Sequence, residues 1–279
     1  MQKGSYGSLE KKQMWEGIGF ILPFLVGFLV FFLIPFVWCV CYSFTSGIGG
    51  TEFAGFENYR SVLGSKAFRL ASYNTLRFMA VGVTALMLLS FALALLLFKG
   101  FRGISLFRVG FLFPLVVPVA TLVMTVQLVI PTNSVGSYGK QSFWVLVALY
   151  VWKNCGYNII LLLAGLAGIP QDLFQVARLE GASGWQVLRS ITIPLMVPMF
   201  FFTFVVSVAN SFKCFREAYI LGGDRPDYSI YMLQHFMNNN YHNLNYQRLS
   251  VAALFVFALI LVILLVLFAI KEKYLEVEL

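Results

Sequence analysis

A chain of 279 residues in which 59% are hydrophobic and only 11% are charged is not a water-soluble domain, since soluble domains carry about 25% charged residues. Its net charge of +8 does not indicate nucleic-acid binding, because the basic residues are scattered beside apolar runs rather than gathered on one face. Composition favours a protein whose surroundings are a lipid bilayer.

Six apolar runs are long enough to cross a hydrocarbon layer of about 30 Å at about 1.5 Å per helical residue. These predicted transmembrane helices are residues 17–42, 75–98, 106–130, 143–166, 194–212 and 250–270. The first run is too long for a signal-peptide core and lacks a small-residue cleavage site, so we expect it to be retained. The sequence predicts an all-α, polytopic membrane protein with one transmembrane domain, residues 17–270.

The distribution of lysine and arginine predicts the orientation of the spans. An even number of spans puts the leader, residues 1–16, and the tail, residues 271–279, on the same side. The short loop between the second and third runs carries Lys99, Arg102 and Arg108, and such loops are favoured on the cytoplasmic side. We therefore expect both termini in the cytoplasm.

The first outer loop is predicted to contain a surface helix. Residues 43–74 contain Phe53, Phe56 and Tyr59 at near-helical spacing, which predicts a helix lying on the membrane surface.

Several prolines fall within the predicted spans. Either helix packing accommodates the kink that each proline causes, or the kink serves gating. They are Pro35, Pro114, Pro118 and Pro198.

Lys153 is the one charge deep in a predicted span, within the polar and aromatic stretch 150–158. A lysine in lipid is unfavourable, so Lys153 either snorkels or pairs with a backbone carbonyl, or the stretch faces a translocation path. Sugar sites favour aromatic faces flanked by amides and hydroxyls, which this part of the sequence supplies. The candidate path residues are Gln127, Tyr150, Asn154, Tyr157, Asn210 and Ser211.

Residues 170–194 form the one long polar segment that reads as ordered helix without spanning the membrane. Pro170 suits the first helical position, and Gly181 permits the left-handed turn that ends the helix. Ser183 and Gln186 have the spacing of a capping box for a second short helix, which Pro194 ends. Leu173, Val176, Ala177 and Leu179 share one face of the first helix. The pattern predicts a docking element.

Residues 211–249 form a third outer segment that carries paired glycines and a run of asparagines. Tyrosines and phenylalanines are interleaved throughout it, a composition typical of a binding loop rather than of disorder.

The sequence contains no pattern for catalysis or metal binding. It has neither HExxH nor GxSxG and no zinc-like Cys/His grouping, so we assign no catalytic residue and no metal ligand. The loop 136–140 lacks the Walker spacing, so any ATP must be bound by another subunit. All 12 acidic residues lie outside the predicted hydrophobic cores, which disfavours a proton-coupled carrier.

Segment 170–194 resembles the EAA loop in the permease subunits of type I ABC importers, whose pattern runs roughly EAAxxDGAxxxxxFxxIxLP. The corresponding residues are Gln175, Val176, Ala177, Glu180, Gly181, Ala182, Leu188, Ile191, Ile193 and Pro194. Gln175 and Glu180 replace the usual glutamate and aspartate, and Val176 replaces an alanine. The helix–glycine–helix form is kept.

Shorter matches spread over residues 50–260 are similar to the carbohydrate branch of that family, in particular to the F-type maltose and glycerol-phosphate permeases. They are residues 55–59, 74–75, 162–166, 169–170, 212–215 and 222–223. The resemblance implies a non-enzymatic permease subunit of a binding-protein-dependent importer in a bacterial cell membrane, forming half of a path for a sugar or oligosaccharide. The same architecture also serves other solutes: glycerol-phosphate, a modified sugar or an oligopeptide.

The resemblance also implies partners and roles. The partners are a second homologous permease, an ABC ATPase dimer that binds ATP and Mg, and an extracellular solute-binding protein that contacts segment 211–249. This chain itself would hold no cofactor. Leu173, Val176 and Leu179 would enter a groove on the ATPase, with Arg178 and Glu180 at its rim. The full set of implied coupling residues is Leu173, Gln175, Val176, Ala177, Arg178, Leu179, Glu180, Gly181, Ala182 and Pro194.

Overall fold

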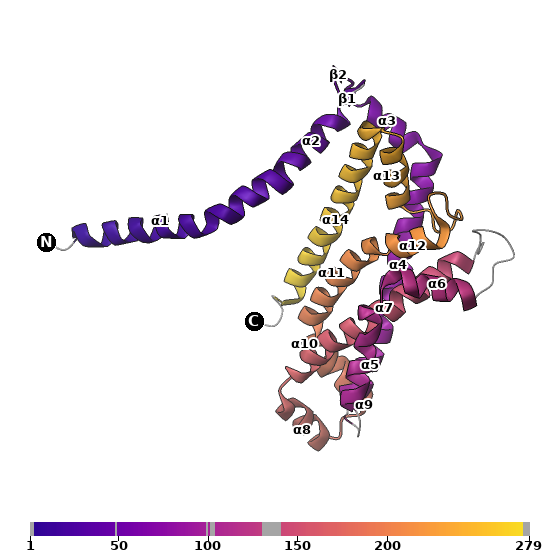
Figure 1. Ribbon diagram of the computed structural model, residues 1–279. Helices are drawn as coiled ribbons and strands as arrows, with labels where there is room; N and C mark the ends of the chain where they lie inside the picture. Colours follow the sequence, from indigo (N-terminus) through magenta and orange to yellow (C-terminus); the bar gives the residue numbers. More distant parts are fainter. Residues whose placement is uncertain (1–2, 48, 99, 101–103, 130–140, 276–279) are drawn as a thin grey trace. The chain divides into compact units, whose positions relative to one another are not determined.

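The computed structural model describes residues 3–47, 49–98, 100, 104–129 and 141–275, and these are mainly helical (Figure 1). Five helical segments are long and apolar enough to cross a membrane, and a bent pair makes a sixth if it counts as one span. The five are Met14–Ser43, Lys66–Phe98, Gln141–Ala167, Val197–Gly222 and Tyr246–Ala269. The predicted all-α class with membrane-spanning helices is confirmed.

Most of the described elements are helices, and one pair of short strands lies between α2 and α3. The predicted loop 136–140 and the end of the predicted tail, 276–279, lie outside the described residues. The elements are α1 (Lys3–Phe28), η1 (Leu29–Leu33), α2 (Ile34–Ser43), β1 (Thr45–Ser46), β2 (Glu52–Phe53), α3 (Glu57–Gly64), α4 (Lys66–Phe98), α5 (Ile104–Val116), α6 (Val119–Val129), α7 (Gln141–Ala167), α8 (Gln171–Leu179), α9 (Gly184–Val187), η2 (Leu188–Thr192), α10 (Ile193–Leu195), α11 (Val197–Lys213), α12 (Phe215–Gly222), α13 (Leu233–His242) and α14 (Tyr246–Leu275).

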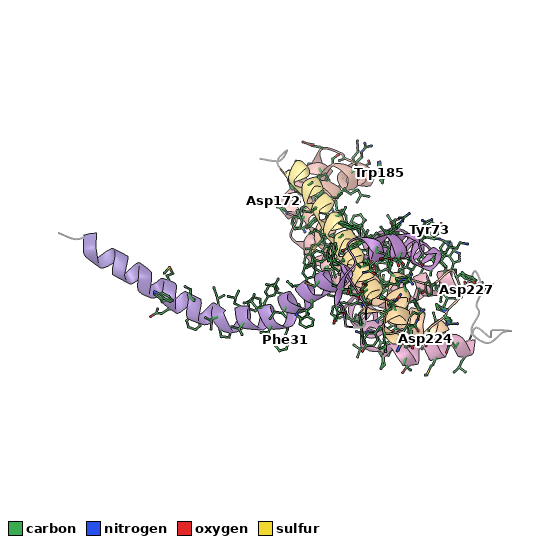
Figure 2. All side chains as sticks on the ribbon, turned by 90° about the horizontal axis from the view of Figure 1, so that it is seen from above. Phe31, Tyr73, Asp172, Trp185, Asp224 and Asp227 are labelled. Atoms are coloured by element: carbon green, nitrogen blue, oxygen red, sulfur yellow. The ribbon has the colours of Figure 1, made fainter. Side chains whose placement is uncertain are left out.

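The chain divides into two compact units, of which one comprises residues 1–63 and 240–255. Its first span runs through α1, the π-helical stretch η1 and α2, and its side chains, Phe31 among them, project outward from the ribbon (Figure 2). Pro35 is the second residue after η1, and the amide of Ile34 between them bonds to the carbonyl of Leu29 in the wider π-helical register. The π turn accommodates the proline within a continuous helix.

The first outer loop of this unit contains a hairpin that the sequence did not predict. Thr45 of β1 is paired with Phe53 of β2 in antiparallel register, so Phe53 lies in a strand rather than in the expected surface helix. The helix, α3, begins only at Glu57. Asn58 fixes it to the hairpin by donating to the carbonyls of Ser43 (3.0 Å) and Thr45 (2.8 Å).

The second unit, residues 64–239 and 256–279, is built on α4, α7 and α11. Phe78 of α4 meets the ring of Tyr150 edge-on at 5.4 Å, and Gly82 lies against the same ring. Where α5 crosses α7, a Cβ at Gly156 would lie 1.7 Å from the carbonyl oxygen of Phe111. The two backbones therefore meet at a position that only glycine allows.

The third predicted span, 106–130, is not one straight helix. Residues Gly110–Val116 and Val119–Leu128 meet at an angle of 101°. Pro118 lies at the break and lacks the amide that would continue the helix. A proline also disfavours helical geometry in the residue before it, here Val117. Pro118 thus ends α5, and the predicted span 106–130 is a bent pair of helices rather than one straight helix.

The segment after α11 is ordered and largely helical. Asn74 of α4 anchors it by donating to the carbonyl of Tyr231 at 3.0 Å and to that of Tyr228. His235 of α13 is buried among aromatic rings, and its Nδ1 accepts from the amide of Met232 at 3.2 Å. Burial lowers the pKa of His235 to about 4, against a smaller opposing effect of Asp224. His235 is therefore neutral at physiological pH.

Candidate functional site

The first helix of segment 170–194 begins one residue later than predicted and ends at the predicted glycine turn. Pro170 is the N-cap of α8, one position before the one we expected. At the other end Gly181 has φ = +76°, and two bonds close the turn: Gly181 N–H to Arg178 (3.1 Å) and Ala182 N–H to Ala177 (2.9 Å). These are the two bonds of a Schellman motif, which confirms the role predicted for the glycine.

The second helix of the segment begins as predicted but ends later. Ser183 accepts from the amide of Gln186 at 3.4 Å, and Gln186 Oε1 accepts from the amide of Ser183 at 2.7 Å, so the capping box is confirmed. Pro194 does not end the helix. It lies in the first turn of α10 directly after the π-helical stretch η2, whose wider register accommodates the missing amide.

The apolar side chains of α8 lie on an exposed face. Leu173, Val176 and Leu179 are 40%, 52% and 89% exposed. On the opposite side Phe174 contacts the ring of Phe98 at 6.3 Å, and Ala177 is buried. An apolar stripe that its own chain leaves uncovered is typical of an interaction site.

Of the remaining residues expected in this segment, Arg178 lies on the opposite face of α8 from the stripe, so its predicted place at the rim is wrong. Gln175, Arg178 and Glu180 are exposed, whereas Ala182 and Pro194 are partly buried. Trp185 of the neighbouring α9 was not among the predicted residues. It is 66% exposed and belongs to the same segment as Asp172 (Figure 2). An aromatic residue two positions after the capping-box serine was the signal for it.

The candidate path residues on α7 are packed between helices. Tyr150 is buried and donates from its hydroxyl to the carbonyl of Ser207 on α11 at 2.6 Å. Asn154 is also buried and donates to the carbonyl of Tyr150 at 2.8 Å. Tyr157 is partly buried. The bond of Tyr150 joins α7 to α11, whereas the bond of Asn154 stays within α7.

The other candidate path residues come from α6 and α11. Gln127 is partly buried and donates to the carbonyl of Ile220 on α12 at 3.3 Å. Asn210 is partly buried and accepts from Lys213 at 3.2 Å. Ser211 is buried and donates to the carbonyl of Val208 at 2.6 Å. Gln127, Tyr157 and Asn210 are thus the candidates that are only partly buried.

Lys153 neither snorkels nor pairs with a backbone carbonyl. Its Nζ lies 2.7 Å from Oε1 of Glu217, a residue of α12 that is 3% exposed and falls within the span Val197–Gly222. The expectation that every acidic residue lies outside the spans is wrong for Glu217. Helix α12 continues α11 after a break at Cys214, so the span is longer than the predicted 194–212.

Two further buried polar residues belong to this region and were missed as candidates. Asn158 donates to the hydroxyl of Ser207 at 2.8 Å, and both side chains are fully buried. The Oδ1 of Asn158 has no hydrogen-bond partner among the described residues. An amide in the middle of a predicted span was the available signal, because buried polar groups need partners.

Known proteins share this arrangement along most of the chain. Residues 18–276 match the family model described as "Binding-protein-dependent transport system inner membrane component". The trehalose/maltose transport system permease protein MalF of Thermococcus litoralis is 29% identical over 246 residues, which are 81% of this chain and 83% of that protein. The probable starch degradation products transport system permease protein AmyD of Thermoanaerobacterium thermosulfurigenes is 26% identical over 80% of this chain and 82% of its own length.

A solved structure shares the fold. A chain in the crystal structure of a bacterial alginate ABC transporter, in complex with alginate pentasaccharide-bound periplasmic protein, superimposes with a TM-score of 0.81. The two chains are 21% identical, and the match covers 95% of this chain and 96% of that one. The matched family model and the shared membrane fold lead to one conclusion: the chain belongs to the family of inner membrane components of binding-protein-dependent transport systems.

Proposed function

We propose that this chain is the permease subunit of an ATP-driven importer for a sugar or oligosaccharide, that it forms half of the translocation path, and that segment 170–194 couples it to a separate ATPase. The exposed apolar stripe of α8 carries the proposal. Amphipathic helices that present such a face are recognised by apolar grooves on partner proteins. Gly181 and the capping box give the segment a defined bend without help from a partner.

The proposed partners follow from this role. They are a second homologous permease, an ABC ATPase dimer that binds ATP and Mg, and an extracellular solute-binding protein. The segment 170–194 and both termini would then face the cytoplasm, in agreement with the basic loop that contains Lys99 and Arg102. The ATPase would bind all the nucleotide, since this chain has no Walker loop.

The chemistry of α7 and α11 supports a saccharide as the solute. Tyr157 and Asn210 are only partly buried, and they offer a ring face and an amide of the kinds that bind sugars. The relatives named above are transport permeases for trehalose or maltose and for starch degradation products. A solute without charge also agrees with Lys153, whose charge is already paired with Glu217.

Reconstituted transporters test the coupling role. The chain would be assembled with its partner permease, ATPases and binding protein, and solute-stimulated ATP hydrolysis and copurification of the ATPase would be measured. Leu179→Asp should weaken ATPase binding at least about tenfold, because it places a charge in the centre of the apolar contact. Ser190→Asp adds the same charge at an exposed position of η2 and should leave both measurements unchanged. Equal effects of the two substitutions would refute coupling through α8.

Uptake kinetics test the solute and the path. Maltose-class oligosaccharides should stimulate transport, and Tyr157→Ala and Asn210→Ala should raise the KM for uptake while basal ATP hydrolysis is unchanged. Stimulation by glycerol-phosphate, a modified sugar or an oligopeptide instead would leave the architecture in place and assign another solute. An unchanged KM in both variants would remove these residues from the path.

A further inference from the structure

A cavity of about 830 Å³ lies between the end of α4 and segment 170–194. Its walls are mostly apolar and include Leu96 and Phe98 of α4 and Phe174 of α8. The polar lining residues are Gln171, Arg178 and Thr192. Gln171, Phe174 and Arg178 are spaced by three and four residues, so they share one face of α8. This face is opposite to the stripe of Leu173, Val176 and Leu179.

Arg178 brings an unneutralised charge to this cavity. Within the ranges that the structure describes, no carboxylate forms an ion pair with Arg178. Its guanidinium has five donors and cannot be deprotonated in a protein, which makes it suited to a phosphate group. The cavity therefore offers a cation beside apolar walls, at the end of a membrane-spanning helix.

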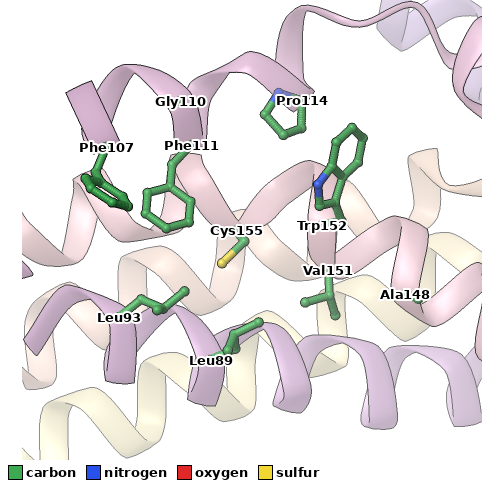
Figure 3. Close-up of a pocket in the computed structure, with 10 residues that line it drawn as sticks. All are labelled: Leu89, Leu93, Phe107, Gly110, Phe111, Pro114, Ala148, Val151, Trp152 and Cys155. Atoms are coloured by element: carbon green, nitrogen blue, oxygen red, sulfur yellow. The ribbon is translucent and has the colours of Figure 1, made fainter. Parts of the chain in front are cut away.

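A second cavity, of about 750 Å³, lies further along α4 (Figure 3). It is lined by Leu89 and Leu93 of α4, Phe111 and Pro114 of α5, and Trp152 and Cys155 of α7. None of its lining side chains carries a charge. An apolar space of this kind suits a hydrocarbon chain rather than water or a sugar.

The two cavities border the same stripe of α4. Leu89 and Leu93 line the apolar cavity, and Ala92 and Leu96 line the one that holds Arg178. From Leu89 to Leu96 the helix rises about 10 Å, at about 1.5 Å per residue. A single molecule with an anionic head and a long apolar tail matches this order along the helix.

We propose that an anionic phospholipid binds along α4, with its phosphate at Arg178 and an acyl chain in the cavity lined by Trp152 and Cys155. Basic pockets at the ends of transmembrane helices are suited to such head groups. The inference deepens the proposed function and rests on it for one consequence: the lipid would brace the inner face of α8 while the outer face contacts the ATPase. Lipid binding itself does not depend on the ATPase.

Quenching of Trp152 by brominated acyl chains tests the site. The full-length chain, with phenylalanine replacing Trp15, Trp38, Trp144 and Trp185, would be placed in vesicles containing a minor fraction of brominated lipid. Brominated phosphatidylglycerol in phosphatidylcholine should quench Trp152 more than brominated phosphatidylcholine in phosphatidylglycerol does. Arg178→Gln should reduce this preference about fivefold, which is about 1 kcal/mol at 1.4 kcal/mol per tenfold.

Two matched controls accompany this measurement. A chain that keeps only Trp144, which lies on α7 outside the apolar cavity, should show no preference between the lipids. Arg189→Gln removes an exposed charge from η2 outside the other cavity and should leave the preference at Trp152 intact. Equal quenching by both lipids, or the same loss in the Arg178 and Arg189 variants, would overturn the proposal.

Native mass spectrometry of the assembled transporter, with all its tryptophans, gives a second measurement that does not rely on the substituted chain. The complex should retain phosphatidylglycerol, and Arg178→Gln should release it. Retention that is unchanged in this variant would overturn the proposal. Because ATP hydrolysis is not measured in either experiment, their failure would leave the coupling role of α8 standing.

Discussion

Segment 170–194 and the bundle of α4, α7 and α11 are stabilised in opposite ways. In the segment, the bonds that set its shape join residues no more than five apart, such as Ala182 to Ala177 and Ser183 to Gln186. In the bundle, the hydroxyl of Tyr150 bonds to a carbonyl 57 residues away. The segment leaves its apolar face uncovered, whereas the bundle buries polar groups among its helices.

The two regions should therefore tolerate amino-acid substitutions differently. A capped helix keeps its shape when exposed side chains are replaced, because no packing depends on them. The bundle is filled by closely packed side chains, so adding or removing a few atoms at a contact lowers its stability. Substitutions in the bundle should therefore act on folding, and substitutions in the segment should act on partners.

The strongest test of the bundle is Gly156→Val. A Cβ at this position would lie 1.7 Å from the carbonyl oxygen of Phe111, so α5 must move away from α7. We expect a loss of at least about 4 kcal/mol in the free energy of unfolding, measured by thermal unfolding in detergent with a thiol-reactive dye. Gly27→Val in α1, where a Cβ meets nothing within 4 Å, should lose far less. Similar losses would show that the crossing at Gly156 is not tight.

The burial of His235 predicts a pH dependence of stability. Its pKa is about 4 in the folded chain and 6.5 without burial, so the unfolded chain binds the proton more readily. The stabilisation is complete above pH 6.5, is lost as the pH falls from 6.5 to about 4, and amounts to about 3 kcal/mol. Thermal unfolding across this range should show the loss, and His235→Gln should reduce it. The exposed His242 serves as control, since His242→Gln should leave the pH profile unchanged.

The ion pair of Lys153 and Glu217 tests whether the bundle depends on charges or on their pairing. Glu217→Leu leaves the Lys153 charge unpaired and should lower the free energy of unfolding by about 2 kcal/mol, less than for a fully buried pair because Lys153 is 22% exposed. The double variant Lys153→Met, Glu217→Leu should recover most of that loss, as measured by a double-mutant cycle. Additive losses in the two single variants would show that the two charges act independently.

The sequence predicted the local structure of segment 170–194 better than the contacts within the bundle. The left-handed turn at Gly181 and the capping box at Ser183 were predicted correctly, because their bonds join neighbours and their residue types have few other uses. The partnership of Lys153 with Glu217 was not predicted, since 64 residues separate the two. A kink at Pro118 was expected, but its size of 101° was not, because hydropathy does not distinguish a kinked span from a broken one. The roles of Leu173 and Asn210 remain predictions.

The smallest expected effect lies at the glycine that ends α8. Gly181 has φ = +76°, a conformation that costs an L-residue about 1 kcal/mol, so Gly181→Ala should open the turn about fivefold more often. Hydrogen exchange at the amide of Ala182, which donates to Ala177, measures this opening directly. Gly184→Ala introduces the same methyl group where φ is not positive and nothing lies within 4 Å, and it should leave exchange at Ala182 unchanged. Global unfolding should stay the same in both variants, since the bundle makes no use of this turn. Faster exchange throughout α7 in the Gly181 variant would mean that the segment and the bundle are not separately stabilised.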